Sequence, residues 1–156
     1  MKIKRNLYEK YYTPGYFGKN GRFYEIARKD IYKFPCTYCG EKATHADHVF
    51  PISVLAWLIE EDGFDIEKER LTIPLVPACQ ECNLALKDVL TDSINKRKRI
   101  IRKRLQRKYK KILSIPEWTD EEISCKGPGI RSYIKESVRL RNETLNKLES
   151  LYGKEE

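Results

Sequence analysis

Two Cys-x-x-Cys pairs, Cys36/Cys39 and Cys79/Cys82, limit what this chain can fold into more than any other feature of its sequence. Each such turn presents two sulfur atoms to one point, and two turns complete the tetrahedral shell that zinc prefers. A closed shell of four thiolates is typical of structural zinc, whose binding contributes on the order of 10 kcal/mol to folding. We therefore expect a zinc-stabilised fold, with the fifth cysteine, Cys125, as a core residue.

Composition and charge indicate an intracellular protein with a polyanionic partner. The length of 156 residues suits one domain. The chain has 31 Lys and Arg against 23 Asp and Glu, and the net charge of +8 favours a polyanion. No apolar stretch approaches the roughly 20 residues that span a bilayer, and the first residues lack the apolar run of a signal peptide. Because thiols stay reduced inside cells, the paired cysteines are interpreted as metal ligands, and we expect a cytoplasmic protein without membrane contact.

Three segments make up the expected single domain, 1–156. They are an N-terminal arm (1–35), a central core (36–90) and a C-terminal helical extension (91–156). The arm is basic and aromatic, and a short helix is expected over 23–31. Its aromatic side chains either stack on nucleic-acid bases or pack beneath the zinc site, and we favour packing.

Local patterns in the core predict two strands with a helix between them. The strands are expected over 44–50 and 71–76, where Pro74 implies an edge or bulge position because proline cannot donate to a sheet. Ser53 is suited to capping a helix over 54–59.

The C-terminal pattern is helical. A long helix follows the second cysteine pair, restarts at Thr91 or Asp92 and ends at Pro116. Thr119 and Glu122 form a capping box, and a glycine-rich turn then introduces a last amphipathic helix. Its apolar stripe comprises Ile130, Ile134, Val138, Leu145, Leu148 and Tyr152.

Three polar residues between and beside the cysteine pairs suit phosphodiester hydrolysis. A neutral His48 is a suitable base near pH 7. The oxygens of Asp47 and Asn83 suit a hard cation such as Mg²⁺ or Mn²⁺. Neighbouring strand residues point to opposite sides, so Asp47 can hold metal while His48 reaches a water if the strand curls at its end. The other histidine, His45, would share a face with Asp47, where it either assists the metal or phosphate or, as we favour, is structural.

Two motifs, D-H-V-F-P at 47–51 and C-Q-E-C-N at 79–83, resemble those of HNH endonucleases of the four-cysteine, ββα-metal type. The resemblance covers residues 36–88 and is greatest to small bacteriophage proteins. It implies a small zinc-stabilised ββα-metal (HNH) core, a two-strand hairpin and a helix. We expect an α+β fold in which the long basic and amphipathic C-terminal helices wrap around this core.

The resemblance also implies roles for single residues. Asp47 and Asn83 would hold the catalytic Mg²⁺ or Mn²⁺, and His48 would be the general base. The family's middle Asn or His has no counterpart in 73–75. Lys87 stands one residue later than the lysine of the family and is a weak candidate for a phosphate contact.

The expected function is therefore metal-dependent cleavage of DNA, with one strand nicked per site. Eleven of the sixteen residues from 96 to 111 are Lys or Arg, a run that is either a solvated face or, as we favour beside a nuclease site, a surface along DNA phosphates. We expect a monomer or homodimer, with phage or host protein partners in a bacterial cytoplasm. The alternative is a zinc-stabilised DNA-binding protein with an inactive HNH site, and RNA as the substrate ranks lower.

Overall fold

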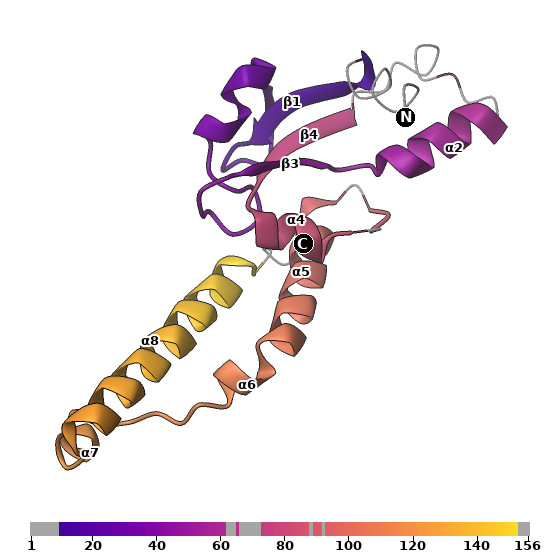
Figure 1. Ribbon diagram of the computed structural model, residues 1–156. Helices are drawn as coiled ribbons and strands as arrows, with labels where there is room; N and C mark the ends of the chain where they lie inside the picture. Colours follow the sequence, from indigo (N-terminus) through magenta and orange to yellow (C-terminus); the bar gives the residue numbers. More distant parts are fainter. Residues whose placement is uncertain (1–9, 62–64, 66–72, 88, 92, 153–156) are drawn as a thin grey trace.

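The computed structural model describes residues 10–61, 65, 73–87, 89–91 and 93–152 and shows an α+β protein (Figure 1). Four strands form one mixed sheet in the order β2-β1-β4-β3. β1 (Tyr12–Phe17) pairs antiparallel with β2 (Phe23–Glu25) and parallel with β4 (Ile73–Ala78), which in turn pairs antiparallel with β3 (His45–His48). The two strands of the expected hairpin therefore pair antiparallel, but a helix lies in the connection between them, and the N-terminal segment adds two further strands.

The N-terminal segment differs from the expected helix over 23–31. Its first residues form β2, and a 3-10 helix, η1 (Arg28–Lys33), follows. The two strands approach closely at Gly15, where a Cβ atom would lie 2.3 Å from the Phe23 ring and 2.5 Å from the carbonyl oxygen of Tyr24. A glycine at this position permits the pairing that overrides the local helical pattern.

Pro74 lies in a central strand, so the prediction of an edge or bulge position is wrong. The amide of Val49 donates to the carbonyl oxygen of Pro74 at 3.2 Å. The N–H and C=O of one strand residue point to the same side, so the missing N–H of Pro74 would point toward β3. The β3–β4 register puts Val49 opposite Pro74, so this pair keeps one of its two ladder bonds, and the carbonyl oxygen of Val49 accepts a hydrogen bond from Arg97 instead.

Helices account for the rest of the described fold: α2 (Ile52–Glu61), α4 (Gln80–Ala85), α5 (Ile94–Lys108), α6 (Lys110–Leu113), α7 (Asp120–Ser124) and α8 (Pro128–Ser150). α2 starts before Ser53, and the carbonyl oxygen of Pro51 accepts its first hydrogen bonds, so capping by Ser53 is wrong. Ser93 caps α5 in place of Thr91, and Asp92 lies outside the described residues. The capping box of Thr119 and Glu122 is confirmed.

The sheet separates two buried clusters. One face packs against the cysteines and the bases of α5 and α8, and its members include Val49, Val76, Ala78, Ile101, Leu105, Leu148 and Leu151. The other face packs against η1 and α2 through Tyr12, Ile31, Leu55, Ile73 and Leu75. Phe17 and Phe23 pack against the first of these clusters, which contains the cysteines, so packing as favoured is found for these two aromatic residues of the N-terminal segment.

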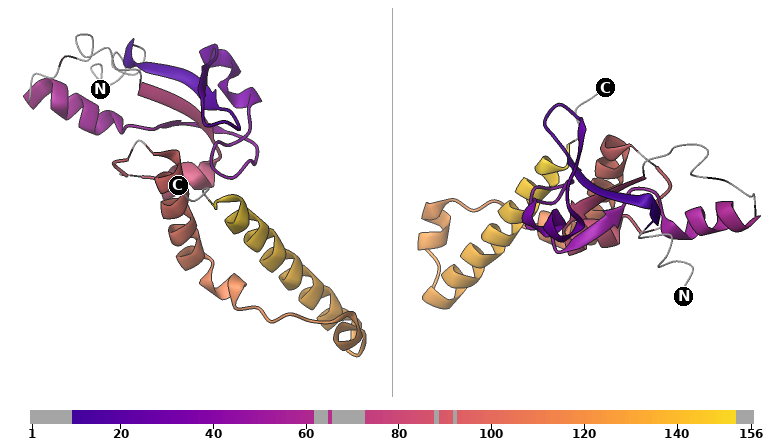
Figure 2. Two further views of the ribbon diagram at one scale, coloured as in Figure 1. Left: turned by 180° about the vertical axis from the view of Figure 1, so that it is seen from behind. Right: turned by 90° about the horizontal axis from the view of Figure 1, so that it is seen from above.

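The C-terminal helices form an arm that projects from the sheet and does not wrap around it, as Figures 1 and 2 both show. α7 lies at the far end, where Ile123 and Ile134 are buried. Cys125 is exposed at the C-cap of α7, so its prediction as a core residue is wrong, because the arm is too thin there to cover it. None of the helices in the described part of the chain is both long and apolar enough to cross a membrane.

Candidate functional site

The first cysteine turn, residues 36–39, is held against the end of β4. The amide of Gly40 donates to the carbonyl oxygen of Cys36 at 2.9 Å, and Gly40 has a φ of 77°, which glycine adopts without strain. The amide of Thr37 donates to the carbonyl oxygen of Pro77 at 2.9 Å. This bond places the first turn beside the chain that leads into Cys79.

The second cysteine turn, residues 79–82, begins α4. Cys79 is the N-cap, and its Sγ accepts a hydrogen bond from the amide of Cys82 at 3.4 Å. The amide of Asn83 donates to the carbonyl oxygen of Cys79 at 3.0 Å. The N-cap of α4 therefore determines the positions of the second pair of sulfur atoms and holds the backbone of Asn83 beside them.

The four cysteines meet as predicted. Their Sγ atoms all lie within 4.8 Å of one another, and all four residues are buried. Cys39 and Cys79 have Sγ atoms 3.7 Å apart, too far for a disulfide. A Zn–S distance of about 2.3 Å places tetrahedral sulfur atoms roughly 3.8 Å apart, so the cluster fits structural zinc. No other group of three or more Cys, His, Asp or Glu side chains in the described residues is close enough to hold a metal.

The thiols also influence one another electrostatically. Hydrogen bonds from the other thiols, first that of Cys39, lower the pKa of Cys36 far below its ordinary value. The pKa of Cys82 is raised well above it, first by its hydrogen bond with Cys36. Burying several thiolates together without a cation is costly, and a bound zinc ion would remove that cost.

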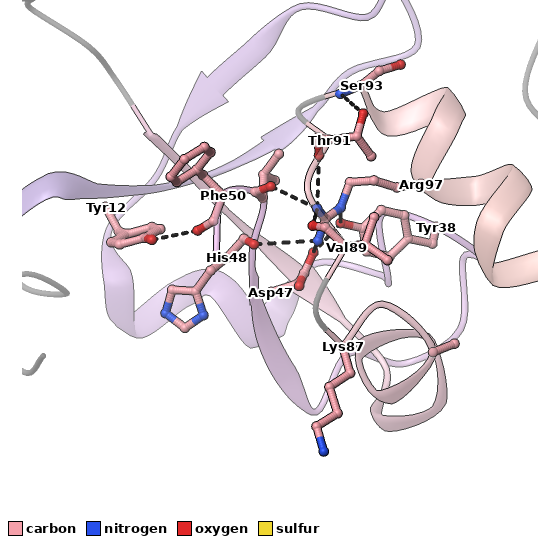
Figure 3. Close-up of polar contacts among 12 residues, drawn as sticks. Tyr12, Tyr38, Asp47, His48, Phe50, Lys87, Val89, Thr91, Ser93 and Arg97 are labelled. Atoms are coloured by element: carbon pink, nitrogen blue, oxygen red, sulfur yellow. Dashed lines mark hydrogen bonds and ion pairs between the residues drawn. The ribbon is translucent and has the colours of Figure 1, made fainter. Parts of the chain in front are cut away.

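Asp47 points to the face of the sheet that carries the cysteines. It is 6% exposed, and its Oδ2 accepts a hydrogen bond from the hydroxyl of Tyr38, which lies between the first two cysteines. The same oxygen lies 2.7 Å from Nη2 of Arg97, a residue of α5 (Figure 3). Both of these contacts use Oδ2, and no hydrogen bond in the described part of the chain engages Oδ1.

His48 points to the opposite face, as strand alternation predicts. Its ring packs edge-on against Tyr12 with centroids 4.7 Å apart, away from Asp47 and Arg97 (Figure 3). Burial lowers the pKa of His48 below 6.5; the nearby Asp47 opposes this shift, and Arg28 adds to it. The neutral imidazole is therefore favoured near pH 7, and the chain bends at Val49 and Phe50 directly after it.

The remaining predicted residues lie around this strand. Asn83 is half-buried on α4, which packs against β3, but no hydrogen bond among the described residues joins it to Asp47. His45 has its Nδ1 2.9 Å from Oγ1 of Thr44. Lys87 is exposed, and its side chain extends away from the Arg97 contacts (Figure 3).

The basic helix α5 has an inner and an outer face. Ile101 and Leu105 are buried on the inner face, and so is Arg97, which shares their four-residue spacing. That spacing is the sequence signal that could have identified Arg97 as an inward-facing residue. The outer basic stripe, as we call it, comprises four exposed residues: Lys96, Arg99, Lys103 and Arg107. It is about 16 Å long at a rise of about 1.5 Å per residue.

A polar groove, which the sequence did not indicate, lies between the β1–β2 turn and the start of α5. Its volume is about 930 Å³. Lys19 and Asn20 line it from the turn, Lys98 from α5 and Tyr152 from the end of the described chain. The groove brings together residues more than seventy positions apart, which no local pattern could reveal.

Comparisons of the chain with models of known protein families, with curated proteins and with solved structures find no match. Fold and site together define an α+β protein with a small four-stranded mixed sheet and a four-cysteine centre suited to structural zinc. The finer resemblance to HNH endonucleases rests on the two sequence motifs.

Proposed function

We propose that this protein is a metal-dependent DNA endonuclease of the HNH type that nicks one strand per site. One observation carries the proposal: the antiparallel pair β3–β4 leads directly into α4 beside the four-cysteine cluster. Asp47 and His48 lie on the strand of this ββα unit, and Asn83 lies on its helix. These are the elements on which the HNH resemblance requires the three residues.

His48 is the proposed general base. Phosphodiester hydrolysis requires a group that accepts a proton from the attacking water. Burial keeps the imidazole of His48 neutral near pH 7, so it is ready to accept that proton. The ring packs against Tyr12, which limits its rotation, and the bend after β3 lies directly beside it.

Asp47 and Asn83 are the proposed ligands of a catalytic Mg²⁺ or Mn²⁺. Oδ1 of Asp47 and the side-chain oxygen of Asn83 have the hard-donor chemistry that these ions prefer. When bound, such an ion would supply positive charge for the phosphate and for the leaving 3′ oxygen. Structural zinc at the four cysteines would fix both elements that carry these ligands.

DNA is the proposed partner because the cationic side chains are concentrated on defined surfaces. The outer basic stripe presents four exposed charges along one face of α5. Such contacts bind phosphates without reading sequence and weaken as salt rises. Two further lysines, Lys19 and Lys98, line the polar groove and extend the cationic surface toward the β1–β2 turn.

Cleavage of supercoiled plasmid tests the proposed activity. Zinc-loaded protein is incubated with Mg²⁺, Mn²⁺ or EDTA, beside a His48→Ala variant. We expect open-circle product only with the divalent ion, and its loss in His48→Ala. His45→Ala is the matched control, because it removes the chain's other histidine from the same strand and should leave nicking unchanged. Linear product in the first turnovers would instead indicate two sites acting together in a homodimer.

The second candidate is a zinc-stabilised DNA-binding protein without nuclease activity. The observation that favours it is the pairing of Asp47 with Arg97 and Tyr38, which leaves one carboxylate oxygen for a metal and neutralises the charge that attracts one. Salt-sensitive DNA binding by zinc-loaded protein that cleaves no DNA with either ion would favour this candidate. Cleavage that persists in His48→Ala would overturn the assignment of the base.

A further inference from the structure

Arg97 is the most completely enclosed charged residue in the described chain, at 1% exposure. Its three nitrogen atoms divide their hydrogen bonds among separate parts of the fold. Nε donates to the hydroxyl of Tyr38 at 3.0 Å, and Nη2 donates to Oδ2 of Asp47 at 2.7 Å. Nη1 donates to the carbonyl oxygens of Val49 at 2.8 Å and Thr91 at 3.0 Å.

These contacts converge on three consecutive residues at the end of β3. Arg97 holds the Asp47 carboxylate and the carbonyl oxygen of Val49, and Nη2 also lies 3.5 Å from the carbonyl oxygen of His48. β3 is an edge strand of only four residues, so β4 supports it on one side alone. The guanidinium thus supplies a partner to the carbonyl oxygen of Val49, to which the facing residue of β4, Pro74, has no N–H to donate.

A lysine could not make the same set of contacts. A guanidinium presents five N–H donors in a rigid planar fork, whereas an ammonium is a single point of charge with three donors. Arg97 uses this fork to join three parts of the fold: the first cysteine turn at Tyr38, the strand end at Asp47 and the segment before α5 at Thr91. Its enclosure also removes it from the cationic surface that would face DNA.

We propose that Arg97 is a positioning residue, which fixes the end of β3 and thereby orients Asp47 and His48 for the reaction. The expected effect of Arg97 on kcat rests on the proposed nuclease function. The expected effect of Arg97 on the order of the β3 end rests on the geometry alone. Tyr38 takes part by donating to the same oxygen of Asp47 that Arg97 contacts.

The test compares Arg97→Lys with the wild type in two measurements. In plasmid nicking we expect kcat to fall by about 10–100-fold, with KM and the DNA dissociation constant within about twofold, because the variant disturbs orientation and not binding. In hydrogen exchange we expect the amide of Val49, which donates to the carbonyl oxygen of Pro74, to exchange at least about tenfold faster. Arg139→Lys, at an exposed arginine paired with Glu136 and Glu143, should change neither.

Tyr38→Phe keeps the proposal testable if Arg97→Lys fails to fold or to retain zinc. It removes one hydroxyl and leaves the buried ring, and it should lower kcat and speed Val49 exchange to a smaller degree. Three results would overturn the proposal: a raised KM with unchanged kcat, a less stable protein whose folded fraction keeps the wild-type kcat, or unchanged Val49 exchange. If the wild type cleaves no DNA, the proposed function fails, and Val49 exchange alone decides whether Arg97 positions the strand.

Discussion

At the scale of single residues, the environment of His48 makes a prediction about pH. Burial lowers the pKa of the imidazole below 6.5, with Arg28 acting in the same direction and Asp47 against it. The neutral form therefore persists below the pH at which an ordinary histidine becomes charged. We expect the NMR titration of His48 to have its midpoint below 6.5 and the acid limb of nicking to follow that midpoint.

The two histidines of the chain make this measurement simple. His45→Ala leaves one imidazole signal, which assigns the resonance of His48 without further labelling. A midpoint at or above 6.5 would contradict the burial of the ring. A nicking profile whose acid limb departs from the NMR midpoint would mean that another group limits the rate.

Single residues also show where sequence reasoning fails. The Asp-His pair on a strand was predicted with its two side chains on opposite faces, because alternation follows from backbone geometry alone. Arg97 was counted among the basic residues of a surface helix. Its spacing with Ile101 and Leu105 could have indicated an inward position, but its partners come from three separate parts of the fold, so only the tertiary structure shows which groups accept its hydrogen bonds.

At the scale of elements, the two cysteine turns predict what metal removal does. Each turn is short, and the sulfur atoms of all four cysteines are inside the larger buried cluster. Zinc binding worth on the order of 10 kcal/mol is comparable to the whole stability of a small domain. We expect chelation, or Cys82→Ser, to abolish cooperative thermal unfolding monitored by circular dichroism, together with loss of about one zinc per chain.

Cys125→Ser is the matched control for this prediction. Cys125 is exposed at the C-cap of α7 and lies outside the cluster, so its replacement should change neither zinc content nor melting. Unchanged cooperative melting after complete zinc removal would show that apolar packing alone maintains the sheet.

The outer basic stripe of α5 predicts how the protein binds DNA. Replacing Lys96, Arg99, Lys103 and Arg107 together with glutamine should weaken binding to duplex DNA. The slope of log affinity against log salt concentration should fall by about 0.9 for each phosphate that the variant no longer neutralises. Fluorescence anisotropy across several salt concentrations measures both effects.

A variant with the same change in net charge separates this local effect from a general effect of charge. Four exposed basic residues of the distal arm serve as the control when replaced with glutamine: Lys126, Arg131, Lys135 and Arg139. We expect the control to keep most of the salt dependence. An equal weakening in both variants would mean that net charge, and not the outer basic stripe, governs binding.

The strands between the two cysteine pairs, and the helix that begins at the second pair, could be predicted from the sequence. The strands before the first pair could not. Strands β3 and β4 and helix α4 follow from local alternation, from the cysteine spacing and from a cap. The pairing of β1 with β4 joins Tyr12 to Ile73, sixty-one residues along the chain, and no local pattern encodes such a parallel contact. The same pairing makes β4 central, which is why an edge position was predicted wrongly for Pro74.

At the scale of the whole molecule, a network of charged side chains fastens the arm to the cysteine turns. Glu81 of α4 lies 2.6 Å from Nζ of Lys108 and 2.7 Å from Nζ of Lys147, and it also accepts a hydrogen bond from Tyr109. Lys147 of α8 lies 2.7 Å from Glu41, beside the first cysteine turn. The carboxylates of Glu41 and Glu81 therefore join both long helices of the arm, α5 and α8, to the two cysteine turns.

The electrostatics of Glu81 give this network a definite dependence on pH. Partial burial raises the pKa of Glu81, but the hydrogen bonds from Lys108, Lys147 and Tyr109 outweigh it and lower the pKa to about 2. A carboxyl whose pKa is lower in the folded protein than in the unfolded chain stabilises the fold above the unfolded value. That contribution is lost as the pH falls from about 4.5 toward 2.

Glu81→Gln should therefore cost about 1–2 kcal/mol of unfolding free energy near neutral pH, a value discounted because Lys108 is largely exposed. Urea unfolding of zinc-loaded wild type and variant measures the difference at each pH where both proteins retain their zinc. The difference should be constant above about pH 5.5 and begin to shrink as the pH falls toward 4.5, because the unfolded chain of the wild type takes up its proton there. Glu143→Gln, which breaks an exposed pair on α8, should cost no more than a few tenths of a kcal/mol at any pH. A pH-independent cost for Glu81→Gln would mean that Glu81 holds the arm by packing and neutral hydrogen bonds, and that its charge contributes nothing to the attachment.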